Sequence, residues 1–282
     1  MNQAKLLTEK QISEFNRDGL LILRNFYDLE QDIKPIQKMV YEIIGFIISK
    51  YDLPIIRPEF NPESFDAGFQ QILAANRTYG AEIYDAVKQI PAFIRLVAKP
   101  EHEQLFRELR TGALPGIAAG GYGVRIDNPN EDKFRASWHQ EYPAQLRSLD
   151  GLVYWSPLVC VTEDMGPVEF CPGSQVEGPI PVFTQSNKKP EKTGAYSLTL
   201  KNEKDLLKKY QHIKPLTNPG DLVIIDFLVL HASGHNTSQR SRWSMQLRYF
   251  NFAEPTGQSY GWQGSYAAGI NFREIHPELC AD

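Results

Sequence analysis

Short runs of β-type residues, separated by glycine- and proline-rich turns, fill the chain from residue 112 onward, and this pattern restricts the fold more than any other feature. Glycines cluster between residues 112 and 123, and the later turns include Asp-Met-Gly-Pro at 164–167 and Asn-Pro-Gly-Asp at 218–221. The predicted strands cover residues 122–126, 151–161, 168–171, 221–230 and 242–252. Many short strands joined by such turns are typical of a sandwich or a jelly roll.

The first third of the chain has a helical pattern instead. Thr8 and Gln11 have the spacing of a capping box at the start of a helix, and Gly19 is suited to end that helix. Apolar residues recur at helical spacing in the following segments. The predicted elements are a helix over 9–18, a short strand over 20–26, a helix over 36–47 and further helical segments between 66 and 110.

These two patterns predict a mainly β protein with flanking helices, built as a double-stranded β-helix of the jelly-roll, cupin-like type. We expect one domain, with a mostly helical flanking segment (1–111), a β-helix core (112–260) and a C-terminal extension (261–282), because sandwiches and barrels of this length commonly form a single unit. We interpret the lysine-rich segment 187–193 as a solvated surface loop, with an active-site lid as the alternative.

Composition and charge exclude several functional classes. The chain has 282 residues and a formal net charge of -4, so no overall positive field attracts nucleic acid or anionic lipid. The three cysteines include no CxxC pair, which fits a reducing compartment, and the first residues contain no apolar secretion signal. The most apolar stretch, 36–48, is too short to cross a bilayer. We therefore expect a cytoplasmic protein without a membrane span, and its oligomeric state stays open.

A candidate metal site combines a His-x-Glu pair with a distant histidine. On an extended backbone, residues i and i+2 point to the same face, so His139 and Glu141 can reach one cation together. The third ligand is expected from His231, which follows the apolar strand 221–230. Two imidazoles and one carboxylate form a facial triad, which leaves positions open on iron(II) for a bidentate 2-oxo acid and for dioxygen.

The His-x-Glu pair alone is weak evidence, but an arginine eleven residues after His231 strengthens it. In the predicted strand that begins at Arg242, polar residues alternate with apolar ones, so one face is polar. That face would meet water in a surface strand, whereas in a closed roll it would line a cavity, where an arginine needs an anion. We expect Arg242 to bind the distal carboxylate of 2-oxoglutarate with help from Ser233; Arg240 is a fallback that we place in the turn.

The sequence resembles the phytanoyl-CoA dioxygenase-like family of iron(II)- and 2-oxoglutarate-dependent oxygenases. The similarity covers most of the chain, and the spacing from His231 to Arg242 is its most specific part. The matching segments are FNRDGLLILRNF at 15–26, the His-x-Glu region, WSPL at 155–158 leading to PGSQ at 172–175, PGD at 219–221, and 231–242.

The resemblance implies an enzyme that uses Fe(II), 2-oxoglutarate and dioxygen to hydroxylate a small molecule, with release of succinate and carbon dioxide. It places Tyr122, Arg125 and Trp155 around the cavity, although strand aromatics are more often packing residues. The family usually has aspartate at the position of Glu141, so we expect altered positioning of the carboxylate with retained metal binding. It also usually has histidine at the position of Gln175. A carboxylate at 141 argues against the halogenase branch.

The remaining histidines are expected to lie outside the site. His235 could replace His231, but its place in the turn favours a surface role. His102, His212 and His276 lie in charged or proline-flanked segments and are expected to be exposed.

Two other classes of protein stay open at the level of the sequence. A zinc hydrolase or a cupin-type isomerase could use the same three ligands, but it leaves Arg242 unexplained. A non-catalytic jelly-roll module that binds carbohydrate or another small ligand does not require the His-x-Glu pair and the distant histidine. Binding of a metal without affinity for 2-oxoglutarate would favour this second alternative.

Overall fold

The chain begins with a helix that is set by its two caps. In the computed structural model, which describes residues 4–184, 198–264 and 272–281, helix α1 covers Glu9–Asp18. The Thr8 hydroxyl accepts a hydrogen bond from the Gln11 amide at 3.2 Å, and the Gln11 side chain accepts one from the Thr8 amide at 2.8 Å. Gly19 ends the helix with φ +63°, in the left-handed region that favours glycine. The predicted capping box is confirmed.

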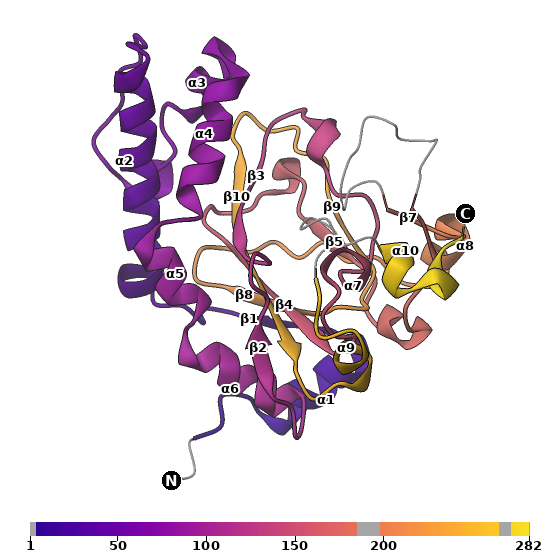
Figure 1. The fold of residues 1–282 in the computed structure, drawn as a ribbon. Helices are drawn as coiled ribbons and strands as arrows, with labels where there is room; N and C mark the ends of the chain where they lie inside the picture. Colours follow the sequence, from indigo (N-terminus) through magenta and orange to yellow (C-terminus); the bar gives the residue numbers. More distant parts are fainter. Residues whose placement is uncertain (1–3, 185–197, 265–271, 282) are drawn as a thin grey trace.

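Helices cover one side of the molecule (Figure 1). The elements concerned are α2 (Lys34–Lys50), α3 (Phe69–Ala75), α4 (Arg77–Val87), α5 (Pro91–Val97) and α6 (Pro100–Leu109). Three of them have a proline at the first or second position, where the missing amide proton costs nothing. The apolar stripe of α2, formed by Ile36, Val40, Ile44 and Ile47, is buried. The helical first third predicted from sequence is present.

A six-stranded antiparallel sheet lies against these helices. Its strand order is β1-β8-β4-β10-β2, and β3 also pairs with β10. The strands are β1 (Leu20–Leu23), β2 (Pro115–Ile117), β3 (Gly123–Asp127), β4 (Gly151–Pro157), β8 (Leu222–Asp226) and β10 (Arg242–Asn251). Two smaller antiparallel pairs are β5 (Val168–Phe170) with β9 (His231–Ser233) and β6 (Val182–Phe183) with β7 (Thr199–Leu200).

Short helical segments connect the strands. The α-helices among them are α7 (Tyr142–Gln145), α8 (Glu203–Leu207), α9 (Pro255–Ser259) and α10 (Phe272–Ile275). Single turns of other helix types occur at Leu29–Ile33, Pro62–Ser64, Asp132–Phe134, Glu163–Met165, Ser174–Glu177 and Pro277–Leu279. None of the helices in the described ranges is both long and apolar enough to cross a membrane.

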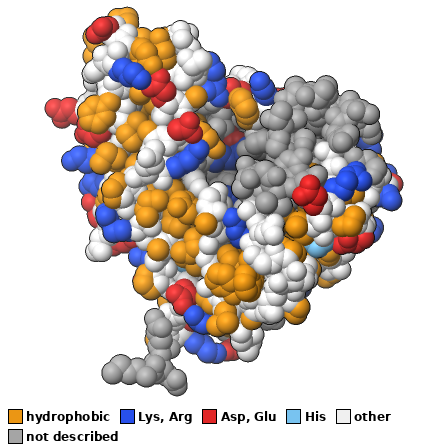
Figure 2. Space-filling model, viewed as in Figure 1, with side chains coloured by type: hydrophobic (Ala, Val, Ile, Leu, Met, Phe, Trp, Pro, Cys, Tyr) orange, Lys and Arg blue, Asp and Glu red, His pale blue; other side chains and the backbone are white. Residues whose placement is uncertain are grey.

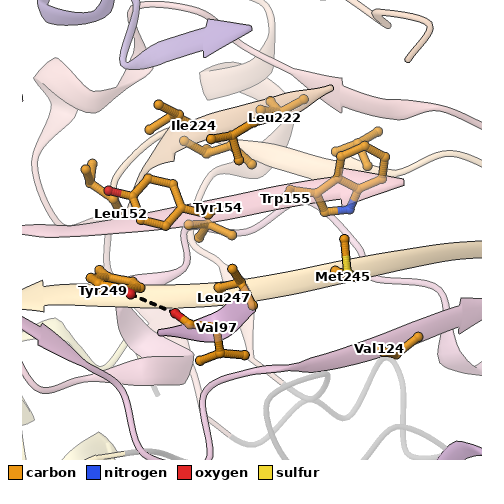
Figure 3. Packing of buried hydrophobic residues seen from close by; sticks show 14 of the residues in the cluster. Val97, Val124, Leu152, Tyr154, Trp155, Leu222, Ile224, Met245, Leu247 and Tyr249 are labelled. Atoms are coloured by element: carbon orange, nitrogen blue, oxygen red, sulfur yellow. Dashed lines mark hydrogen bonds between the residues drawn. The ribbon is translucent and has the colours of Figure 1, made fainter. Parts of the chain in front are cut away.

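The two faces of β10 have different environments, as its alternating sequence predicts. Leu247 and Tyr249 are buried and lie opposite Tyr154 and Leu152 of β4 (Figure 3). The Tyr249 hydroxyl donates a hydrogen bond to the Val97 carbonyl oxygen at 2.7 Å, which joins the sheet to the end of α5. The core therefore lies between the helices and this face, and the opposite face carries the polar residues Arg242, Ser244, Gln246 and Arg248.

The structure corrects two expectations about the fold. More of the described residues lie in helices than in strands, so the chain is a mixed helix and sheet protein and not mainly β. The predicted strand 221–230 is divided, because a turn at Asp226 carries the chain from β8 in the large sheet to β9 in a small one. The Asp226 carboxylate accepts the Leu228 amide at 2.8 Å, and the Asp226 carbonyl accepts the Val229 amide at 3.0 Å. The lysine-rich segment 187–193 lies outside the described residues.

His102 was expected at the surface and is instead fully buried in the core. Its Nε2 lies 2.7 Å from the Tyr27 hydroxyl oxygen, and its ring stacks on Tyr154 with centroids 5.0 Å apart. Burial lowers the pKa of His102 to about 3, because the charged imidazolium would lose its hydration. His102 lies on the buried face of α6 together with Leu105, Phe106 and Leu109, although the residues next to it in the sequence are charged.

This burial predicts a pH-dependent stability. Below the unfolded-state pKa of 6.5, the unfolded chain binds a proton at His102 that the folded chain does not bind. Protonation therefore favours the unfolded chain, and the free energy of unfolding decreases as the pH falls below 6.5. Between pH 7 and pH 5 this group should lower the free energy of unfolding by about 2 kcal/mol. In His102→Gln, the free energy of unfolding measured by urea denaturation should change by about 2 kcal/mol less between pH 7 and pH 5 than in the wild type. An equal slope in the variant and the wild type would contradict the prediction.

Candidate metal centre

A backbone bridge brings two of the predicted ligands together. The amide of His139 donates to the His231 carbonyl at 3.0 Å, and the amide of His231 donates to the His139 carbonyl at 3.1 Å. Directly opposed residues of an antiparallel pair have side chains on the same side of the ladder. The two imidazole rings are accordingly close, with centroids 4.2 Å apart.

Glu141 reaches the same point from a different backbone conformation than the one expected. It is not extended: φ −69° and ψ −35° place it in the α-helical region, immediately before α7, and its amide donates to the Phe227 carbonyl at 2.8 Å. Its Oε2 lies 3.7 Å from Nε2 of His139 and 3.5 Å from Nε2 of His231. One ligand atom from each of the three residues lies within 4.8 Å of the others, so the group could hold a metal ion.

The hydrogen bonds of the two imidazoles leave both Nε2 atoms available to bind a metal ion. Nδ1 of His139 lies 2.7 Å from the Ser137 carbonyl oxygen, and Nδ1 of His231 lies 2.9 Å from the Val229 carbonyl oxygen. A carbonyl oxygen can only accept, so Nδ1 carries the proton and the Nε2 lone pair is directed toward Glu141. Backbone carbonyls commonly fix metal-ligating histidines in this way. The donor set therefore fits a divalent cation.

The electrostatics of the three groups agree with this assignment. Burial, followed by the neighbouring His139, lowers the pKa of His231, which favours the neutral imidazole that a metal requires. Burial alone would raise the pKa of Glu141, but the Arg248 guanidinium beside it holds that pKa well below its usual range. Glu141 is thus an ionised carboxylate although it is only 3% exposed.

Arg248 is a member of the site that the sequence interpretation missed. Its Nε donates to Oε1 of Glu141 at 2.9 Å, Nη1 donates to the Gly121 carbonyl at 3.2 Å, and Nη2 donates to Oε1 of Gln246 at 2.8 Å. The alternation of polar and apolar residues could have identified Arg248, because it places Arg248 on the same polar face of the strand as Arg242. Which carboxylate Arg248 meets depends on the pairing of β10 with β4 and of β4 with β8.

The three candidate ligands lie in the wall of a cavity of about 590 Å³. In Figure 2 the surface is hollowed beside α3 and α4, with Lys and Arg side chains (blue) at the edge of the hollow. Four further residues predicted from sequence, Tyr122, Arg125, Trp155 and Ser233, line the same cavity. Among the described residues, the lysines and arginines that line it are Lys88, Arg125, Lys133 and Arg248, and the acidic lining residue is Glu141.

Arg242, the predicted anchor for 2-oxoglutarate, is not among the residues that line this cavity. It is 1% exposed, donates from Nη2 to Oδ2 of Asp127 at 2.9 Å, and also donates to the Gly166 carbonyl. Asp127 faces Arg242 across the β3–β10 ladder and also binds Arg125, which does line the cavity. Despite burial, these two guanidinium groups lower the pKa of Asp127. Two arginines therefore share one carboxylate, and of these three residues only Arg125 lines the cavity.

The other candidate residues are separate from the site. His235 is exposed and binds Asp132 at 2.9 Å, which confirms its expected surface role. Arg240 lies in a bend before β10 and pairs with Asp66 at 2.7 Å. His212 is exposed as expected, whereas the expectation of an exposed His276 is wrong: it is 8% exposed because α10 packs it against the Tyr142 hydroxyl.

Comparison with solved structures shows that the fold is shared with enzymes of known architecture. EctD from S. alaskensis, solved with 2-oxoglutarate and 5-hydroxyectoine, is 16% identical over 89% of this chain and 78% of that chain, with a TM-score of 0.56. The epimerase SnoN, solved with Fe3+, alpha ketoglutarate and nogalamycin RO, is 16% identical over 93% and 91%, with a TM-score of 0.55. The alpha ketoglutarate dependent carbocyclase SnoK from nogalamycin biosynthesis is 13% identical over 87% and 85%, with a TM-score of 0.55. Comparison with curated protein sequences gives no significant match.

On this fold, the two-histidine, one-carboxylate group defines a candidate non-heme metal site. The family model for phytanoyl-CoA dioxygenase (PhyH) matches residues 15–244, which is most of the chain. The chain belongs to the phytanoyl-CoA dioxygenase family.

Proposed function

We propose that this protein is an Fe(II)- and 2-oxoglutarate-dependent dioxygenase that hydroxylates a small-molecule metabolite and releases succinate and carbon dioxide. The observation that carries the proposal is the convergence of Nε2 of His139, Nε2 of His231 and Oε2 of Glu141 on one point in the cavity wall. The membership in the phytanoyl-CoA dioxygenase family supports it. We further propose that residues 112–260 form a double-stranded β-helix core within one domain, and that the protein acts in the cytoplasm.

The residues around the triad have separate roles in this proposal. When bound, the ferrous ion would activate dioxygen, which is the oxidant, and 2-oxoglutarate would supply two of the electrons and leave as succinate and carbon dioxide. Arg242, with Arg125 and their shared Asp127, would provide the positive charge that receives the distal carboxylate, since two guanidinium groups there face one protein carboxylate. Ser233 would donate a hydrogen bond from its hydroxyl to the same distal carboxylate. Tyr122 and Trp155 would form part of the cavity wall that excludes water.

The test is formation of succinate by the purified protein. Anaerobic protein loaded with Fe(II) and 2-oxoglutarate should release succinate when air is admitted, in proportion to the 2-oxoglutarate consumed. Removal of the metal with a chelator should stop the release, and added Fe(II) should restore it. A zinc hydrolase, a cupin-type isomerase or a non-catalytic binding module would bind a metal without consuming 2-oxoglutarate, so that outcome would reject the proposal.

A further inference from the structure

We propose that Arg248 is a positioning residue that restricts Glu141 to one metal-ligating atom, Oε2. The inference rests on the proposed function for the identity of the co-substrate, but its central claim concerns any divalent cation bound by the triad. A carboxylate can bind a cation through one oxygen or through both. Which mode it adopts decides how many positions are left for the 2-oxo acid and for dioxygen.

The geometry separates the two oxygen atoms of Glu141. Oε2 faces the two imidazole nitrogens at 3.7 and 3.5 Å, while Oε1 accepts the hydrogen bond from Nε of Arg248 at 2.9 Å. A hydrogen bond between two ionised groups is about twice as strong as a neutral one. Oε1 would have to give up this bond to become a second ligand.

Arg248 is itself held in place and cannot follow the carboxylate. Its side chain is 14% exposed, and its other two nitrogens bind the Gly121 carbonyl and the Gln246 side chain. It projects from the middle of β10, where it lies opposite Val153 of β4. These two other acceptors, one in the turn before β3 and one on β10 itself, fix the direction from which the guanidinium approaches Oε1.

This restraint has a physical reason in the identity of residue 141. A glutamate side chain has one more rotatable bond than an aspartate, so its carboxylate can turn to present one or both oxygens. A fixed guanidinium removes that freedom. It also balances the charge of Glu141, so the charge of the bound cation stays available to attract a dianionic co-substrate.

The test uses Co(II) as a spectroscopic probe together with 2-oxoglutarate. In Arg248→Met we expect Co(II) affinity to change by less than about tenfold, the Co(II) absorption spectrum to shift as Oε1 becomes a ligand, and 2-oxoglutarate affinity to fall roughly 10- to 100-fold. Arg248→Lys, which keeps the charge but has a single nitrogen, should give an intermediate spectrum. Arg240→Met removes an arginine from an ion pair outside the cavity and should leave both readouts unchanged.

A double-mutant cycle provides the decisive comparison. In Glu141→Asp the shorter carboxylate should not reach Arg248, so adding Arg248→Met should alter the Co(II) spectrum little further. If folded Arg248→Met and Arg248→Lys both keep the wild-type Co(II) spectrum and 2-oxoglutarate affinity, the role assigned to Arg248 is wrong. Wild-type protein that binds Co(II) but not 2-oxoglutarate would reject the proposed function, and the spectrum of the variants would still decide the role of Arg248.

Discussion

Replacement of His231 by alanine should lower Fe(II) affinity and 2-oxoglutarate turnover by more than about a hundredfold. Loss of a hydrogen-bond partner of a metal ligand already costs roughly 10- to 100-fold, and His231 is a candidate ligand itself. With His231 removed, the described part of the chain offers only His139 and Glu141 at this point in the cavity wall. Calorimetric titration with Fe(II) measures the metal affinity, and mass spectrometry of the succinate formed measures the turnover.

His235→Ala is the matched control, because it removes a histidine four residues away that is exposed and bound to Asp132. It should change neither metal affinity nor turnover. Equal losses in the two variants would mean that segment 231–242 acts through its fold. An effect confined to His235→Ala would identify His235 as the metal ligand in place of His231. Unchanged turnover in His231→Ala would remove the triad from the proposal.

Replacement of Arg242 by methionine should weaken 2-oxoglutarate binding by about a hundredfold, while Co(II) or Fe(II) affinity changes little. A hydrogen bond to a charged group contributes roughly 1.5 to 3 kcal/mol, and the bond expected here joins a guanidinium to a carboxylate. The variant should also lose stability, because removing one partner of a buried ion pair costs about 3 to 5 kcal/mol. The loss should lie near the lower end of that range, since Asp127 keeps Arg125. Calorimetric titration and urea denaturation provide the two measurements.

Two further variants decide which guanidinium receives the distal carboxylate. Arg240→Met should leave 2-oxoglutarate affinity intact, because Arg240 pairs with Asp66 away from the cavity. Arg125→Met removes the arginine that lines the cavity and shares Asp127. If Arg125→Met loses the affinity and Arg242→Met keeps it, the anchor is Arg125, and Arg242 serves to hold Asp127 in place.

Several elements could be predicted from the sequence because their causes are local. The capping box of Thr8 and Gln11 and the glycine that follows specify α1 at both ends. The alternation of polar and apolar residues specifies β10, and its two faces follow from the period of a strand. The three candidate metal ligands could also be predicted, since a His-x-Glu pair and a histidine after an apolar strand are visible in the sequence.

Other features could not be predicted because they depend on contacts between distant segments. The backbone of Glu141 turns into α7, so the carboxylate reaches the imidazoles by a route that an extended His-x-Glu pair does not describe. His102 is buried by Tyr27, 75 positions earlier, and by the stacked ring of Tyr154, 52 positions later. Neither partner is visible in the charged sequence around it.

The sequence by itself determined which chemical groups are available: two imidazoles, a carboxylate and a strand with arginines on its polar face. The tertiary structure alone decided how those charges are paired, with Arg248 beside Glu141 and Arg242 beside Asp127. Local periodicity fixes the direction of a side chain from its strand, whereas the identity of its neighbour is set by strand register and by burial. A buried charge is stable only beside its counterion, so this second choice governs the chemistry of the site.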